Sequence, residues 1–258
     1  MAQRRLEDFV PPPELFAARN DYADVARNLF DLLVEVSGLA PGERVLDVGC
    51  GTGRLAAPLL DHLGPDGSYE GFDRDASRID WCNEHIAPLH SNFKFQTVSV
   101  FNSSRQKGDL PAGELRFPYP DADFDLVFLF SVFTHMLPKG VERYLAEIRR
   151  VLRPGGRNVI TWFLLNDESR QALDEQHDER SDRASNAHKS RFSHDLGVCR
   201  VADRARPEAV VAFDERFVLD TYAKNGLEVD HPIHYGSWIG REDTLLNQDV
   251  VLAHRPAT

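Results

Sequence analysis

The stretch that decides the fold is VLDVGCGTGRL, residues 45–55. An apolar run ending at Asp47 opens into three glycines, Gly49, Gly51 and Gly53, and then into an apolar, helix-compatible segment. This pattern predicts a buried strand, a tight turn and the start of a helix. Glycine permits positive φ and lets a ligand approach where a Cβ would stand, and the free N–H groups of a helix's first turn attract an anion. The turn is therefore expected to hold a small ligand.

Strand-like and helix-like segments alternate around this turn. Apolar strands are expected, with helices between them, at residues 44–48, 68–72, 93–100, 124–130 and 158–165. A strand-like segment at 209–213, a helix at 214–225 and strands at 229–235 and 249–254 follow, and the link between the last two strands is short enough for a hairpin. The alternation predicts an α/β fold: a Rossmann-like, doubly wound seven-stranded sheet, mostly parallel with an antiparallel C-terminal hairpin. Ligands of such sheets bind at the carboxyl ends of the strands.

Charge and periodicity divide the chain into four parts. We expect an N-terminal leader and helix at 1–40, a ligand-binding α/β core at 41–166, and a C-terminal completion of the core sheet at 209–258. The segment 167–208 is dense in charge and lacks periodicity, so it is either a linker or a lid. Because it follows the strand at 158–165, its start lies on the ligand side of the sheet, and we favour a lid or substrate cap.

Composition excludes several classes of partner. With 258 residues and a net charge of −11, the chain is a poor match for DNA or RNA, whose binding depends on Lys and Arg. Cys50, Cys82 and Cys199 have neither paired spacing nor an even count, which argues against disulfides or a zinc site. No signal-peptide pattern or membrane-length apolar run is present. We expect a cytoplasmic protein with a small-molecule partner, no membrane and no metal; whether it forms a homodimer is open.

The glycine turn has competing interpretations. A dinucleotide fingerprint needs Gly-x-Gly-x-x-Gly, but here the third glycine comes one residue early and Arg54 stands in its place. The pattern Asp-x-Gly-x-Gly-x-Gly instead resembles the first motif of class I S-adenosylmethionine-dependent methyltransferases. GFDRD at 71–75, FDLVF at 124–128 and VLRPGG at 151–156 resemble that family in the expected order. Together with these, GSWIGR and NQDVV near the C-terminus resemble a bacterial subgroup that modifies glycans or other secondary metabolites.

The resemblance implies S-adenosylmethionine as cofactor, with S-adenosylhomocysteine as product. The glycine-loop amides suit its methionine carboxylate, and Asp47 suits its ammonium unless Asp47 only braces the loop. Asp73 is expected to accept hydrogen bonds from the ribose hydroxyls, with a helix N-cap as the alternative. Arg74 either lies on the adenine or is an exposed residue at a helix start.

Further contacts are implied beyond strands three and four. Where the family commonly has an acidic residue for the adenine amino group, this chain has Ser99, which can accept the same hydrogen bond. Val100 and Phe101 offer backbone amides and an apolar wall. The expected cofactor-binding residues are Asp47, Gly49, Cys50, Gly51, Gly53, Asp73, Arg74, Ser99, Val100, Phe101, Phe130 and Ser131.

The catalytic candidate is His135, directly after the fourth strand. A hydroxyl acceptor must lose its proton as it attacks the methyl group, and histidine titrates near neutrality. His135 is therefore predicted to be the base, with a capping or substrate-orienting histidine as the alternative. Amine methyltransferases of nucleic acids usually carry Asn/Asp-Pro-Pro-Tyr here, whereas this chain has Phe130-Ser131-Val132-Phe133.

We therefore predict methyl transfer to a small molecule, with a sugar or metabolite hydroxyl as the favoured acceptor. The alternatives are N- or carboxyl-methylation of a small molecule, a non-catalytic S-adenosylmethionine-binding protein and a nicotinamide oxidoreductase. The early third glycine argues against the last of these.

Overall fold

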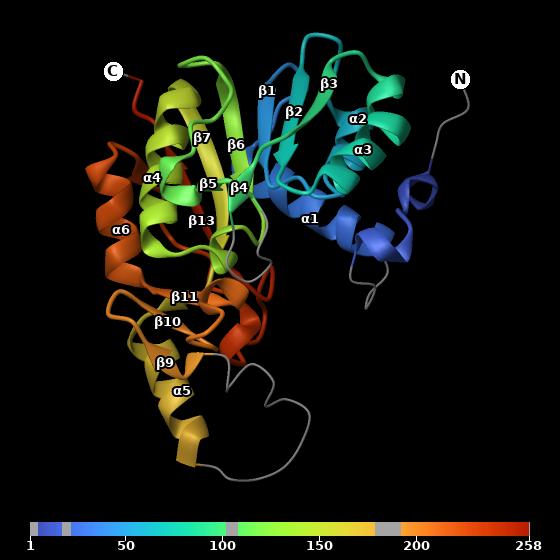
Figure 1. The fold of residues 1–258 in the computed structure, drawn as a ribbon. Coiled ribbons are helices and arrows are strands. Elements are labelled where there is room, and N and C mark those ends of the chain that lie inside the picture. Colours follow the sequence, from blue (N-terminus) through green and yellow to red (C-terminus); the bar gives the residue numbers. More distant parts are fainter. Residues whose placement is uncertain (1–4, 17–21, 102–107, 179–191, 258) are drawn as a thin grey trace.

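A seven-stranded sheet forms the centre of the molecule (Figure 1). The computed structural model describes residues 5–16, 22–101, 108–178 and 192–257. The strand order across the sheet is β12 (Glu228–Val229), β13 (Asp249–His254), β7 (Leu152–Trp162), β6 (Phe124–Leu129), β1 (Arg44–Val48), β2 (Ser68–Asp73) and β3 (Phe93–Thr97). Neighbours pair in parallel except along β13, which runs antiparallel to β12 and β7. The predicted doubly wound sheet with an antiparallel C-terminal hairpin is confirmed.

Helices bury both faces of this sheet. Figure 1 shows α1 (Tyr22–Ser37), α2 (Ala56–His62) and α3 (Ala76–His85) on one face, and α4 (Pro138–Val151) and α6 (Glu215–Lys224) on the other. In β1, Val45 packs into the core on the α1–α3 side, whereas Leu46 and Val48 pack into the core on the opposite side. Apolar residues on both faces explain why the strands read as nearly continuous apolar runs. None of the described helices is long and apolar enough to cross a membrane.

Short polar signals set where the helices begin. The Asp75 carboxylate accepts a hydrogen bond from the Ser77 amide and caps α3. Asp214 caps α6 in the same way, accepting from the amides of Arg216 and Phe217. Pro138 occupies the first turn of α4, where its missing N–H is not needed. Asp75 and Asp214 lie at or just after the end of a strand, so each cap holds the start of its helix close to that strand.

A second sheet of four strands lies at that carboxyl edge, below the main sheet in Figure 1. Its order is β8 (Leu164–Leu165), β11 (Val211–Asp214), β10 (Cys199–Val201) and β9 (His194–Asp195), and α5 (Asp167–Asp178) packs beside β8. The strand expected at 209–213 therefore belongs to this sheet and not to the core sheet. Phe213 pairs with Leu164 and Cys199, partners that an apolar run alone does not reveal.

Several predicted strands are shorter or divided. The third ends at Thr97, and the Val100 amide then donates to the Val98 carbonyl in a tight turn that leads into β4 (Val100–Phe101), which pairs with β5 (Leu110–Pro111). The fifth divides into β7 and β8, and the strand expected at 229–235 reduces to β12 and a single bridge between His234 and Val250.

Candidate functional site

A cavity of about 620 Å³ opens at the carboxyl edge of the main sheet. Its volume lies in the range typical of small-molecule sites. Eleven of the thirteen residues predicted for the site line it, all except Gly53 and Ser99. Those eleven are Asp47, Gly49, Cys50, Gly51, Asp73, Arg74, Val100, Phe101, Phe130, Ser131 and His135.

The glycine loop is tied to the end of β2. The amides of Gly49 and Cys50 both donate to the Phe72 carbonyl, at 2.8 and 3.1 Å, and the Gly51 amide donates to Asp73 Oδ2 at 3.0 Å. These three amides are thus engaged within the protein, which leaves them poorly placed for the role predicted for them, binding a ligand carboxylate. Cys50 lies in the same wall, and burial raises the pKa of its thiol well above the usual value.

Gly53 serves packing and does not face the cavity. Its φ is +72°, and a Cβ there would collide with the Ile86 side chain and approach Cys82 Sγ. The third glycine of the motif therefore lets α3 pack against the start of α2. Its expected contact with a ligand is not what the structure shows.

Asp73 ends β2 with its carboxylate at the cavity. Oδ2 accepts from the Gly51 amide and Oδ1 accepts from the Asp75 amide at 2.9 Å. The helix N-cap is Asp75, so the capping alternative for Asp73 is wrong. A carboxylate has about four lone-pair sites, so each oxygen can still accept one hydrogen bond from a ligand hydroxyl. Arg74, half-buried, forms the adjacent wall.

Asp47 is buried at the floor of the cavity, with 4% of its surface exposed. Burial raises its pKa to about 8; the Tyr69 hydroxyl, which donates to Oδ2 at 2.8 Å, lowers it, and the nearby charge of Asp73 raises it. A cation bound beside this carboxylate would favour its ionised form. That Asp47 contacts a ligand ammonium stays a prediction.

The segment after β3 contributes an apolar wall. Val100 and Phe101 line the cavity, and Phe101 is 43% exposed. Ser99 does not reach it: its hydroxyl donates to Asp109 Oδ2 at 2.8 Å and accepts from the Asp109 amide at 3.1 Å. Its predicted hydrogen bond to adenine is therefore replaced by a local turn, because a partner ten residues away occupies the hydroxyl.

The loop after β6 forms the facing wall. Phe130, Ser131 and Val132 line the cavity, and Ser131 has φ of +58°, the left-handed region that non-glycine residues rarely adopt. A Cβ on Gly49 would lie 2.6 Å from Val132 Cγ2, so the two loops pack without space between them. Glycine is required at 49 by this approach as well as by its own φ of +80°.

His135 lies farther along the same loop, in η5 (Phe133–His135), and is solvent-exposed. The second sheet meets it there, since η8 (Pro207–Ala209) packs against η5 and brings Glu208 to the cavity. Tyr144 from α4 completes this end, and burial raises the pKa of its hydroxyl. Basic and acidic groups therefore surround one end of the cavity, opposite in character to the apolar wall at Val100. That 167–208 acts as a lid stays a prediction.

Arg54 lines the cavity and was not among the contacts predicted from the sequence. Arg54, at the start of α2, lines the cavity with its guanidinium carbon 4.9 Å from the centre of the Tyr22 ring. The Tyr22 hydroxyl in turn hydrogen-bonds Thr52 Oγ1 at 2.9 Å, and burial raises the pKa of Tyr22 to about 12. Arg54 thus presents a fixed positive charge where the loop amides are engaged. Arg54 stands where the dinucleotide pattern has its third glycine, and this was the signal in the sequence that could have indicated the contact.

Among the described residues, no group of three or more His, Cys, Asp or Glu side chains is placed to hold a metal ion. That the reaction needs no metal stays a prediction.

Comparison with known proteins relates part of the chain, including the glycine loop, to methyltransferases. Residues 45–156 match a family described as a methyltransferase domain. The chain is 31% identical over 129 residues to 2-phytyl-1,4-naphtoquinone methyltransferase of Synechococcus elongatus, covering 50% of this chain and 49% of that protein. It is 33% identical over 129 residues to the O-methyltransferase cnsE of Penicillium expansum, covering 47% and 38%. The chain thus spans about half or less of the curated relatives that it matches.

Solved structures agree on the fold. The structure of 1,6-didemethyltoxoflavin-N1-methyltransferase of Burkholderia thailandensis, with bound 1,6-didemethyltoxoflavin and S-adenosylhomocysteine, aligns with a TM-score of 0.52. The alignment covers 90% of this chain and 78% of that one at 19% identity. At this identity the likeness concerns the fold alone.

Proposed function

We propose that this chain is a class I S-adenosylmethionine-dependent methyltransferase, as its motifs predicted, and that it methylates a small molecule on a hydroxyl oxygen. The favoured acceptors are a sugar or another secondary metabolite. The observation that carries the proposal is the shared cavity: ten of the twelve residues expected for the cofactor line one space together with His135. A net charge of −11 supports a small acceptor over a nucleic acid.

The residues of the cavity fit the cofactor of this family, S-adenosylmethionine. Asp73 is suited to the ribose hydroxyls, because each of its oxygens retains a lone pair after the bonds to Gly51 and Asp75. Buried Asp47 is suited to the methionine ammonium, and Arg54 to the methionine carboxylate. When bound, the cofactor supplies a methyl group activated by a sulfonium. The protein must then orient the acceptor oxygen and exclude water.

His135 is proposed to take the acceptor proton. Its position after β6 lets it face an acceptor bound in the cavity, which Tyr144 and Glu208 also line. A neutral imidazole is a competent base at neutral pH and typically contributes about 10²–10⁴-fold. An amine or carboxylate acceptor would not need this base, so the dependence on His135 distinguishes the acceptor classes.

The test is release of S-adenosylhomocysteine in the presence of pools of sugars, phenols, amines and carboxylic acids. We expect turnover with a hydroxyl pool, reduced at least about 100-fold in His135→Ala, with S-adenosylhomocysteine affinity within about twofold of the unsubstituted protein. Turnover with amines or carboxylates alone, independent of His135, would replace the hydroxyl proposal by N- or carboxyl-methylation. Binding without turnover across all pools would favour a non-catalytic S-adenosylmethionine-binding protein.

A further inference from the structure

The loop after β6 is held in a strained conformation by two neighbours. The Ser131 amide donates to Thr161 Oγ1 on β7 at 2.8 Å, and the Ser131 hydroxyl donates to Gln248 Oε1 at 3.0 Å. A left-handed conformation costs a non-glycine residue about 1–2 kcal/mol. Ser131 has φ of +58°, so contacts with its surroundings must offset the cost of this backbone conformation.

The position of this loop sets the width of the cofactor end of the cavity. Val132 follows Ser131 and packs directly on Gly49. Phe130 and Ser131 line the same cavity as Asp73 and the glycine loop. A shift of Ser131 would therefore move the wall that faces the glycine loop.

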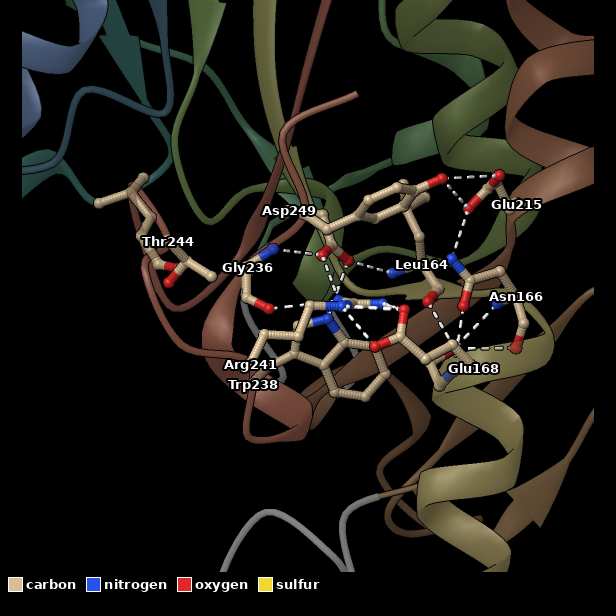
Figure 2. A network of polar contacts seen from close by, with 12 residues as sticks. Leu164, Asn166, Glu168, Glu215, Gly236, Trp238, Arg241, Thr244 and Asp249 are labelled. Atoms are coloured by element: carbon tan, nitrogen blue, oxygen red, sulfur yellow. Dashed lines mark hydrogen bonds and ion pairs between the residues drawn. The ribbon is translucent and has the colours of Figure 1, made fainter. Parts of the chain in front are cut away.

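Gln248 precedes a fully buried carboxylate, Asp249, which is bound on both oxygens (Figure 2). Oδ1 accepts from the Gly236 amide at 2.7 Å. Oδ2 accepts from the Leu164 amide at 2.7 Å and from Trp238 Nε1 at 2.9 Å. We call Asp249 and these three donors the Asp249 clasp. The clasp joins β13 to β8 and to the segment that carries GSWIGR.

The backbone of Gln248 is fixed by the same segment. A Cβ on Gly236 would collide with the backbone carbonyl of Gln248, so the two chains cross at the closest approach that glycine allows. The Ser237 and Trp238 amides donate to the carbonyls of Leu246 and Asn247, each at 3.0 Å. These contacts fix the backbone at Gln248, whose side chain accepts the hydrogen bond from Ser131.

The clasp also reaches the second sheet's helix, α5. Arg241 Nη1 lies 3.6 Å from Asp249 Oδ1, and its guanidinium donates to the Glu168 carboxylate of α5 at 2.9 to 3.1 Å (Figure 2). The Arg241 side chain is 14% exposed, so this ion pair is partly shielded from water. A continuous set of contacts thus runs from α5 through Arg241 and Asp249 to Gln248 and Ser131.

We propose that Gln248 is a positioning residue of the cofactor pocket, which, anchored by the Asp249 clasp, holds Ser131 in its left-handed conformation. Gln248 acts through the Ser131 hydroxyl and does not need to touch the cofactor. The inference requires only the cofactor pocket, so it is independent of which acceptor the protein methylates.

Calorimetry with S-adenosylhomocysteine tests the proposal without an acceptor. Gln248→Ala should weaken binding about 3- to 10-fold, the effect of one neutral hydrogen bond. Gln248→Glu, which keeps an acceptor oxygen at the same place, should retain the affinity of the unsubstituted protein. In the Ser131→Ala background, Gln248→Ala should cause no further loss, because the hydroxyl it acts on is already absent. Asn247→Ala, an exposed neighbour that contributes only its backbone, is the matched control and should bind normally.

Three results would overturn the proposal. One is wild-type affinity in Gln248→Ala. Another is independent, multiplying losses from Ser131→Ala and Gln248→Ala. The last is a large drop in melting temperature that Gln248→Glu does not restore, which would make Gln248 a part of the fold and not of the pocket.

Discussion

Asp47 gives the sharpest prediction, because its ionisation couples the fold to the cofactor. Burial raises its pKa to about 8, against 3.8 for an ordinary aspartate. One pKa unit corresponds to about 1.4 kcal/mol, so keeping this carboxyl protonated at pH 7 costs the ligand-free fold about 4 kcal/mol. Asp47→Asn removes that cost and keeps an acceptor for the Tyr69 hydroxyl. We expect it to raise the melting temperature of the free protein by about 10 °C.

The same substitution should weaken binding of S-adenosylhomocysteine, since the ligand ammonium loses its partner. In the unsubstituted protein, an ammonium beside Asp47 drives off the proton, so binding at pH 7 should release about 0.9 proton. Affinity should rise about tenfold per pH unit up to pH 8 and then level off. The contribution of Asp47 to the stability of the free protein changes in the opposite direction: it is fully present below pH 3.8 and is lost as the pH rises through about 8.

The assay is calorimetry in buffers of different ionisation enthalpy, where the slope of the observed enthalpy counts the protons exchanged. Asp47→Asn is the control, because any proton exchanged by the ligand itself remains. A slope of zero in both proteins, with affinity unchanged by the substitution, would refute the ammonium contact and leave Asp47 as a brace for the loop.

Three further predictions concern other residues. Asp73→Ala should weaken S-adenosylhomocysteine binding at least about tenfold by calorimetry, since charged hydrogen bonds are worth about 1.5–3 kcal/mol each; unchanged affinity would remove Asp73 from the site. Arg54→Gln should weaken the same binding about tenfold while the melting temperature stays nearly constant, and a loss of stability without a loss of affinity would limit Arg54 to its contact with Tyr22. Asp249→Ala leaves three buried donors unpaired, which costs about 1–3 kcal/mol for each donor. Removing a carboxyl whose pKa is raised by burial returns about 3 kcal/mol. Urea unfolding should therefore show a net loss of about 3 kcal/mol in the free energy of unfolding.

The main sheet could be predicted from the sequence because its signals are local. β1 and β13 span the residues expected, since each is a short apolar run bounded by polar or glycine residues. Asp47 and Asp73 could be selected because each lies at or next to the carboxyl end of a strand, where ligands of such sheets bind. The sheet edge then brings together residues far apart in the chain, as the fold class requires.

The rest depends on partners that local patterns do not encode. The strand expected at 209–213 is real as β11, but its neighbours β8 and β10 place it in a second sheet. Ser99 does not reach the cavity because its hydroxyl bonds Asp109, and Gly53 does not face the cavity because α3 packs on it. Arg54 became a candidate only once the loop amides were seen to be engaged at Phe72 and Asp73.

The measurement that most directly tests the account follows a tritiated methyl group from S-adenosylmethionine into a pool of hydroxylated small molecules. We expect label in a product that survives mild base, as a methyl ether does and a methyl ester does not, and almost no label with His135→Ala. Label recovered only in amines or esters, or in no acceptor at all while S-adenosylhomocysteine binds, would contradict it.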